Sequence, residues 1–148
     1  HMDVLRPDCL IISDLQGDEF PQVLDYLAIG SRGMFAMEGT SSRDALARLE
    51  TFATRGNLSR PLLGIREEIV RALDLIVHIS MMDFGLRRVV TIDEVSGIRN
   101  DAIELNTIFE YKADDDTQQT TGYTPKIVKR IKNHHTPIEF SESIFDVE

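Results

Sequence analysis

The sequence predicts an α/β fold, in which a short parallel-sheet segment and amphipathic helices come first and an antiparallel β-meander with a short C-terminal helix comes last. Three observations predict this order. An apolar run at residues 10–12 is bounded by turn-forming residues, apolar residues then recur at helical spacing as far as residue 73, and the spacing finally changes to strict alternation. The 148 residues are 42% hydrophobic and 28% charged, as expected for a globular domain of ordinary size.

The N-terminal segment predicts a strand, a helix and a second strand. The apolar run Leu10–Ile12 is typical of a buried strand of a parallel sheet. A helix follows, with Asp18 as its cap and Pro21 in its first turn. Gly30 closes this helix, and residues 34–37 form a second short strand. The apolar positions of the helix define one buried face: Phe20, Val23, Leu24 and Leu27.

Two further helices show clearer periodicity. Ser41 or Ser42 caps the first of them, which ends at Gly56. Its buried face comprises Ala45, Leu46, Leu49, Phe52 and Ala53. The second begins near residues 59–61, and its buried face comprises Leu62, Ile65, Ile69, Val70 and Leu73.

From residue 75 onward the alternation predicts three antiparallel strands. Residues 75–81 form the first, 88–95 the return strand and 103–111 the third. The tripeptide Asp83-Phe84-Gly85 supplies one turn and residues 97–101 supply another. The tripeptide also occurs in kinases, but no other kinase motif accompanies it here.

The last part of the chain is polar and then helical. Residues 113–121 contain an Asp114–Asp116 run and are expected to form a solvated loop without a calcium-loop pattern. A short basic helix follows from Thr124 to Lys132. The apolar pair Ile144 and Phe145 is expected to dock the C-terminus.

Composition excludes several functional classes. No apolar run is long enough to span a membrane, and a net charge of −9 argues against binding to a nucleic-acid backbone. The lone Cys9 cannot form an internal disulfide and suits a reducing compartment. It is expected to be a buried structural thiol. His1-Met2 resembles the remnant of a purification tag, which leaves residues 3–148 as the domain.

Asp14 is the position that most suggests chemistry, because it follows the carboxyl end of an apolar strand. A carboxylate there could orient a metal-bound or attacking water, although a turn or capping aspartate has the same pattern. Gly30-Ser31-Arg32-Gly33 has neither the lysine nor the spacing of a phosphate-binding loop. His134-His135 have too few companion ligands for a zinc site, so no metal is expected.

The segment Arg6–Gly17 (RPDCLIISDLQG) resembles the Walker B region of type II/type IV secretion ATPases, in the CpaF/TadA-like branch that powers tight-adherence pili. The similarity continues in order along nearly the whole chain, through residues 42–50, 65–69, 72–77, 87–88, 93–95, 108–111 and 122–125.

The resemblance implies that residues 3–148 are the C-terminal portion of a RecA-like motor domain, from the Walker B region onward and without a Walker A loop. Such domains assemble into cytoplasmic hexamers at the inner face of the bacterial inner membrane, where they act on a platform protein. The implied partners are therefore secretion ATPase subunits and that platform protein, with no nucleic acid and no membrane span. ATP and Mg²⁺ would be bound in the parent protein only if a phosphate-binding loop lies upstream.

Four side chains of the family pattern are replaced. Asp14 stands where the family usually has glutamate, and Gln16 stands where an arginine usually follows. Two histidines of the family are missing from residues 30–33 and 37–41. The remaining catalytic candidates are vestigial, and they are Asp14 and Glu38. The weak candidates for nucleotide binding are Gly17, Arg32 and Gly33.

These replacements favour a catalytically degenerate subunit with a structural or regulatory role in a secretion or pilus-assembly machine. Loss of several positioning and electrostatic groups together should nearly abolish phosphoryl transfer. Two alternatives stay open. The chain could belong to an active motor in which Asp14 or Glu38 replaces the glutamate, or it could be a stand-alone protein-interaction adaptor on the same scaffold.

Overall fold

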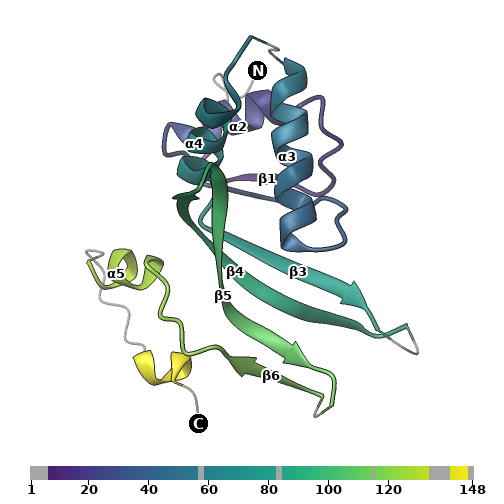
Figure 1. The fold of residues 1–148 in the computed structure, drawn as a ribbon, viewed down its shortest axis with the longest axis vertical. Helices are drawn as coiled ribbons and strands as arrows, with labels where there is room; N and C mark the ends of the chain where they lie inside the picture. Colours follow the sequence, from purple (N-terminus) through teal and green to yellow (C-terminus); the bar gives the residue numbers. More distant parts are fainter. Residues whose placement is uncertain (1–6, 57–58, 83–84, 115, 134–140, 147–148) are drawn as a thin grey trace. The chain divides into compact units, whose positions relative to one another are not determined.

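The computed structural model describes residues 7–56, 59–82, 85–114, 116–133 and 141–146. It is a mixed α/β structure that contains a two-stranded parallel sheet and a four-stranded antiparallel sheet (Figure 1). The chain divides into two compact units. Unit 1 comprises His1–Leu73 with Gly97–Ile103, and unit 2 comprises Asp74–Ser96 with Glu104–Glu148. No described helix is both long enough and apolar enough to cross a bilayer.

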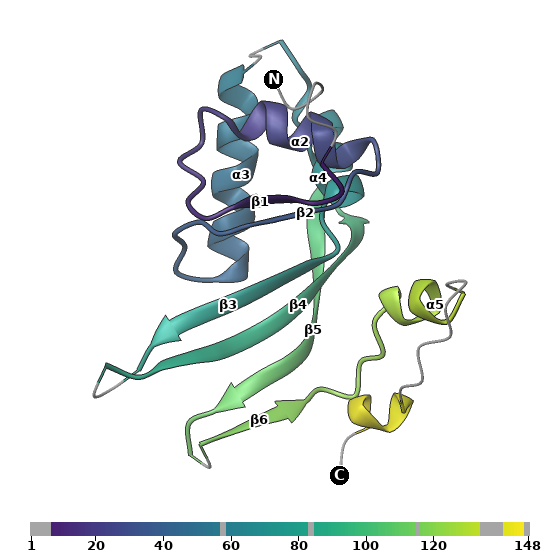
Figure 2. The ribbon, with the colours of Figure 1, turned by 180° about the vertical axis from the view of Figure 1, so that it is seen from behind.

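The parallel sheet of unit 1 consists of β1 (Leu10–Ile12) and β2 (Gly33–Phe35), so the predicted parallel strand is confirmed. The expectation that residues 10–12 form a buried strand is wrong, because Ile11 is 69% exposed and its two neighbours are only partly buried. Helices lie on one face of the strand pair only, as Figures 1 and 2 show from opposite sides. The other face carries Ile11 beside its register partner Met34.

Three helices form the core of unit 1: α2 (Phe20–Ala28), α3 (Ser42–Gly56) and α4 (Leu62–Ala72). Their contacting faces bury Phe20, Val23, Leu24, Leu27, Leu46, Leu49, Ala53, Ile65 and Ile69. The whole predicted apolar face of α2 is therefore confirmed. The predicted face of α4 is confirmed at Ile65 and Ile69, whereas Leu62 lies at the start of the helix and is 44% exposed.

The helix caps decide between two sequence-based alternatives. Ser41 caps α3, since its Oγ accepts a hydrogen bond from the Asp44 N–H at 3.1 Å. The Asp44 carboxylate in turn accepts from the Thr40 N–H at 2.9 Å, and this bond lowers the pKa of Asp44. The predicted cap at Asp18 is wrong: α2 begins after Glu19, and no side chain caps it.

Two arginines attach the end of the β4–β5 hairpin to the helices of unit 1. The Arg66 guanidinium bonds both carboxylate oxygens of Glu50, at 2.8 and 3.0 Å, and also donates to the Asp101 carbonyl. The hydrogen bond to Glu50 is the main cause of the raised pKa of Arg66. Arg43 donates to the Ile103 carbonyl from the neighbouring helix. A cavity of about 170 Å³ lies beside these contacts.

The antiparallel sheet runs in the order β3 (Leu75–Met81), β4 (Arg87–Arg99), β5 (Ala102–Lys112) and β6 (Thr117–Thr120). The predicted turn at residues 97–101 is shorter than expected, because β4 continues to Arg99. The expectation of a loop at 113–121 is wrong for residues 117–120. They form β6, whose polar Thr and Gln side chains lie on an edge strand paired with β5.

The C-terminal segment of unit 2 contains α5 (Ile127–Lys132) and a short 3₁₀ helix, η2 (Glu142–Phe145). Ile108 of β5, Val128 of α5 and Phe145 of η2 form a small buried cluster. Phe145 therefore docks as predicted, whereas its neighbour Ile144 is 53% exposed.

Candidate functional site

The carboxyl edge of the β1–β2 sheet brings together two of the residues that the sequence singles out. Because β1 and β2 are parallel, their carboxyl ends lie at the same edge. The pairing extends past the strands, since the Ala36 N–H donates to the Ile12 carbonyl at 2.9 Å and the Leu15 N–H donates to the Ala36 carbonyl at 2.8 Å. Asp14 and Glu38 follow β1 and β2 by two and three residues, and both are exposed.

Asp14 takes part in a local turn. The Gln16 Nε2 donates a hydrogen bond to the Asp14 Oδ2 at 2.9 Å, and the Gln16 backbone N–H donates to the Glu19 carboxylate at 2.9 Å. The carboxylate of Asp14 is thus bonded to the side chain that stands two residues later. This is the geometry of a turn aspartate at a sheet edge, one of the two readings that the sequence left open.

Two candidate glycines have a packing role. Gly17 has a φ of +113°, and a Cβ at this position would lie 2.6 Å from the ring of Phe52. A Cβ on Gly33 would lie 2.8 Å from a methyl carbon of Leu27. Neighbouring side chains therefore fill the space beside each glycine, and that space is not a cradle for a phosphate.

Arg32 and Gly33 lie at the opposite end of the sheet from Asp14. The Arg32 carbonyl accepts from the Leu10 N–H at the beginning of β1. Asp14 is four residues further along, which is about 13 Å in extended chain. The structure thus groups Asp14 with Glu38 and separates their backbone from that of Arg32 and Gly33.

The residues considered as metal ligands or thiols do not form a centre. Among the described residues, no group of three or more His, Cys, Asp or Glu side chains is arranged to hold a metal ion. His134, His135, Asp83, Phe84 and Asp115 lie outside the described residues. The prediction that Cys9 is buried is wrong. The Cys9 side chain is exposed, because the residue precedes β1 and lies outside the packed core of unit 1.

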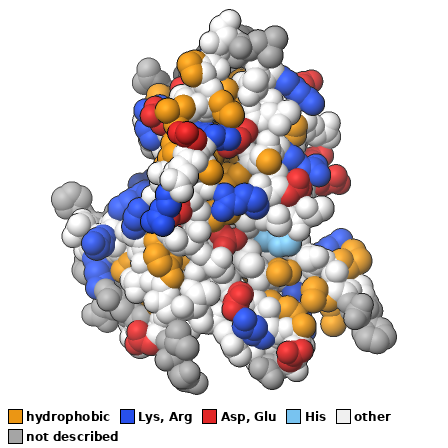
Figure 3. All heavy atoms as spheres, in the orientation of Figure 1, with side chains coloured by type: hydrophobic (Ala, Val, Ile, Leu, Met, Phe, Trp, Pro, Cys, Tyr) orange, Lys and Arg blue, Asp and Glu red, His pale blue; other side chains and the backbone are white. Residues whose placement is uncertain are grey.

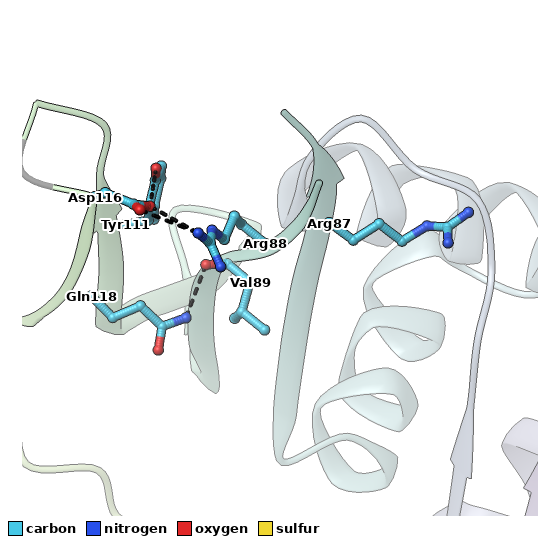
Figure 4. A pocket seen from close by; sticks show the side chains of 6 residues that line it. All are labelled: Arg87, Arg88, Val89, Tyr111, Asp116 and Gln118. Carbon is cyan, nitrogen blue, oxygen red and sulfur yellow. Dashed lines mark hydrogen bonds and ion pairs between the residues drawn. The ribbon is translucent and has the colours of Figure 1, made fainter. Parts of the chain in front are cut away.

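Unit 2 has a surface cavity of about 330 Å³, lined by Arg87, Arg88, Val89, Tyr111, Asp116 and Gln118. Figure 4 shows Arg88 and Tyr111 converging on Asp116, while Arg87 points away from them. The Tyr111 hydroxyl donates to Asp116 at 2.9 Å, and this bond raises the pKa of Tyr111. Arg88 pairs with the same carboxylate at 3.2 Å. The opposite charges of Arg88 and Asp116 therefore neutralise each other.

Two adjacent carboxylates, Asp93 and Glu94, are buried in β4 with 5% and 4% exposure. Successive residues of a strand point to opposite faces, and each carboxylate has its own donors. Asp93 accepts from the hydroxyls of Thr91 at 2.7 Å and Thr107 at 2.6 Å. Sequence reasoning missed this pair. The signal is two consecutive acids between apolar residues inside an alternating strand.

Glu94 connects β4 to the C-terminal segment. It accepts from the Tyr123 hydroxyl at 2.6 Å and from the Ile127 backbone N–H at the start of α5, at 3.1 Å. Asn106 donates to the same hydroxyl at 3.2 Å. Burial, followed by the bond to Glu94, raises the pKa of Tyr123. A fully hydrogen-bonded buried carboxylate of this kind positions a segment and is not exposed for chemistry.

No protein-family model matches this chain, and no curated protein is significantly similar to it. The fold and the candidate site define the chain as an α/β protein with exposed carboxylates at the carboxyl edge of a parallel sheet. In open α/β sheets this edge is the usual place for ligands.

Proposed function

We propose that the chain is the C-terminal part of a RecA-like motor domain of the CpaF/TadA-like secretion ATPase class. In this proposal it serves a secretion or pilus-assembly machine as a structural or regulatory subunit without ATP turnover of its own. The sequence resemblance of residues 6–17 is the ground for the family, and the hydrogen bond between Gln16 and Asp14 supports the absence of turnover. The two positions at which the family has a glutamate and an arginine hold side chains that bond each other.

Elementary chemistry explains why this replacement removes activity. Aspartate is one methylene shorter than glutamate, so its carboxylate falls short of a water by roughly 1 Å, an error that costs about 100-fold in rate. Glutamine has no charge with which to stabilise a transferring phosphoryl group. In this proposal Gly17 and Gly33 do not cradle a phosphate, since Phe52 and Leu27 fill the space beside them.

The proposal includes a location and partners. A subunit of this class would act in the cytoplasm at the inner membrane, within a ring of secretion ATPase subunits and against a platform protein. The chain's contribution would be to receive or transmit conformational change from active neighbours.

A phosphate-release assay on the full gene product tests this function. We expect background turnover for the natural sequence and no further loss for Asp14→Asn. The double change Asp14→Glu with Gln16→Arg restores two of the four replaced side chains and, if a phosphate-binding loop lies upstream, should raise turnover at least about 10-fold. Asp18→Glu is the matched control, because Asp18 is exposed in the same loop. Natural turnover equal to that of ordinary members of the class would contradict the proposal.

The position of Asp14 and Glu38 at one edge of the sheet supports a second candidate function, an active motor in which one of these carboxylates orients the water. Parallel strands β1 and β2 bring both residues to one edge. In that case the upstream coding sequence contains a Gly-rich loop ending in Lys-Thr or Lys-Ser. Asp14→Asn or Glu38→Gln would then reduce turnover by about 100-fold or more, whereas Asp18→Asn would leave it unchanged.

A further inference from the structure

The last part of unit 2 folds back over one face of the antiparallel sheet. We call this part the strap; it comprises residues 122–133 and 141–146 and includes α5 and η2. Two strap residues, Val128 and Phe145, form a buried cluster with Ile108 of β5. Three further side chains are partly buried against this cluster: Ile92, Phe109 and Tyr123. The apolar attachment of the strap to the sheet is therefore small.

A buried carboxylate, Glu94 of β4, holds the polar end of the strap. It is 4% exposed, and it accepts hydrogen bonds from the Tyr123 hydroxyl at 2.6 Å and the Ile127 N–H at 3.1 Å. Both donors belong to the strap. When the strap lifts, water reaches the carboxylate and replaces both donors, so opening leaves no buried charge without a partner.

The other polar attachments of the strap lie at the surface. Lys126 donates to the Ser96 carbonyl at 2.7 Å, and Arg130 pairs with Asp74; both contacts are exposed. Exposed contacts of charged side chains contribute little to stability. The bonds to Glu94 are therefore the main polar attachment.

The strap depends on the sheet for its structure. Its helical elements have six and four residues, and isolated helices of this length are not stable in water. Its outer surface is basic, since the last turn of α5 contains Lys129, Arg130 and Lys132, and blue side chains gather over α5 at the left of Figure 3. The strap begins at Gly122, whose φ of +78° lies in the region that favours glycine.

We propose that the strap is a conformational device that detaches from the sheet as one unit while β4 and β5 stay paired. The bond between Tyr123 and Glu94 controls how often it opens. Detachment uncovers Ile92 and Ile108 beside the Glu94 carboxylate. The closed strap thus keeps an apolar and acidic face of the sheet out of contact with solvent and with other molecules.

Thiol labelling in a Cys9→Ser background tests whether the strap opens as a unit. Val128→Cys places a thiol in the strap, and Ile108→Cys places one beneath it. Val95→Cys is the matched control, because Val95 is 7% exposed and follows Glu94 on the opposite face of β4. Each rate is divided by that of the same variant unfolded in urea. The strap and sheet thiols should react at similar rates, at least about 100-fold faster than the control.

Two results of the labelling experiment would overturn the proposal. Equal rates at all three positions would mean that the strap opens only when the sheet unfolds. Fast labelling of Val128→Cys with slow labelling of Ile108→Cys would mean that opening does not uncover the sheet. A far-ultraviolet spectrum checks that each variant is folded.

Removing the Tyr123 hydroxyl tests the control of opening. Tyr123→Phe should accelerate labelling of Val128→Cys by about 5-fold, the effect of one lost hydrogen bond, and should leave labelling of Val95→Cys unchanged. Tyr111→Phe is the matched control, because it removes an exposed hydroxyl bond to Asp116 elsewhere on the sheet. The same change for both phenylalanine variants, or no acceleration by Tyr123→Phe, would contradict the role of Glu94.

Hydrogen exchange of the natural chain tests the proposal without any substitution. The amides of Ile127 and Asn133 should exchange at least about 100-fold faster than those that pair β4 with β5. Equal protection of the two groups would overturn the proposal. The inference is independent of the proposed function, since none of these experiments involves a nucleotide.

Discussion

The two units are stabilised by different kinds of contact. The largest fully buried side chains are Phe20, Val23, Leu24, Leu49, Ile65 and Ile69, and all of them belong to unit 1. The buried set of unit 2 is smaller, and it includes two carboxylates. Unit 1 therefore depends on apolar packing, whereas unit 2 depends on buried hydrogen bonds.

The elements of each unit explain this difference. In the described part of unit 1, three helices present apolar faces to one another; α2 buries four side chains of its face, and α4 buries Ile65 and Ile69. Among the described residues of unit 2, the helical elements beside the sheet are the six-residue α5 and the short 3₁₀ helix η2. Its apolar cluster is therefore small, and specific polar bonds hold the C-terminal segment against the strands.

The largest expected effect is that of Phe20→Ala in unit 1. Phe20 is completely buried and contacts Phe35 edge to face, with ring centroids 6.0 Å apart. Its removal leaves a cavity among close-packed helices, so we expect the free energy of unfolding to fall by about 3–5 kcal/mol. Urea denaturation followed by far-ultraviolet circular dichroism measures this loss.

Ile29→Ala is the control for Phe20→Ala, because Ile29 is an equally apolar residue that is 80% exposed. We expect a change of less than about 0.5 kcal/mol. Similar losses for the two variants would show that the buried cluster does not stabilise unit 1. The statement that unit 1 depends on apolar packing would then be contradicted.

The second prediction concerns the buried carboxylate of unit 2. Glu94→Ala leaves the Tyr123 hydroxyl and the Ile127 N–H without their acceptor. We expect a loss of about 2 kcal/mol in the free energy of unfolding. Glu94→Gln keeps an acceptor oxygen and should lose less. Hydrogen exchange of α5 amides should accelerate in Glu94→Ala, which shows where the loss acts.

Glu110→Ala is the control for a carboxylate on the same sheet. Glu110 is 41% exposed and pairs with Lys112 at the surface, and exposed pairs contribute little. A loss as large as that of Glu94→Ala would contradict the idea that burial makes the difference.

The third prediction concerns a polar contact of unit 1, the side-chain cap of α3. Ser41→Ala removes the side-chain cap of α3, and we expect a loss of about 1 kcal/mol. This is smaller than the effect of Glu94→Ala, because the end of α3 is accessible to water. Ser13→Ala is the control, since Ser13 is exposed and precedes no helix. A loss in the free energy of unfolding larger than that of Glu94→Ala would contradict this ranking of the two polar contacts.

Local patterns predicted most of the fold. The faces of α2 and α4 follow from helical spacing, and the change to alternation at residue 75 marks the start of the antiparallel sheet. The strand β6 could not be predicted in this way, because its Thr and Gln residues carry no apolar period and gain order from pairing with β5. Exposure of Ile11 also depends on tertiary structure, since it reflects which face of the sheet the helices cover.

The candidate site was predictable to a smaller extent. Parallel strands place Asp14 and Glu38 at one edge, and the sequence indicated both residues. The roles of Gly17 and Gly33 were not predictable, because Phe52 and Leu27 reach them only in the folded unit. The same holds for Glu94, whose donors are 29 and 33 residues away in the sequence.

The smallest expected effect concerns the polar network of unit 2, and it is a change in how the free energy of unfolding depends on alkaline pH. Burial and the bond to Glu94 raise the pKa of Tyr123 above its ordinary value of 10.0. The folded chain therefore keeps this proton at a pH where the unfolded chain releases it, so stability is fully present below pH 10 and falls as the pH rises above it. Tyr123→Phe lacks the proton, and its free energy of unfolding should fall less steeply than that of the natural chain between pH 9 and 11, a range chosen to bracket the ordinary pKa of tyrosine.

Urea denaturation at successive pH values measures both slopes, and all other titrating groups are common to the two chains. Parallel slopes would mean that the Tyr123 hydroxyl has the same environment in the folded and unfolded chains, and that Glu94 is held by the Ile127 N–H alone.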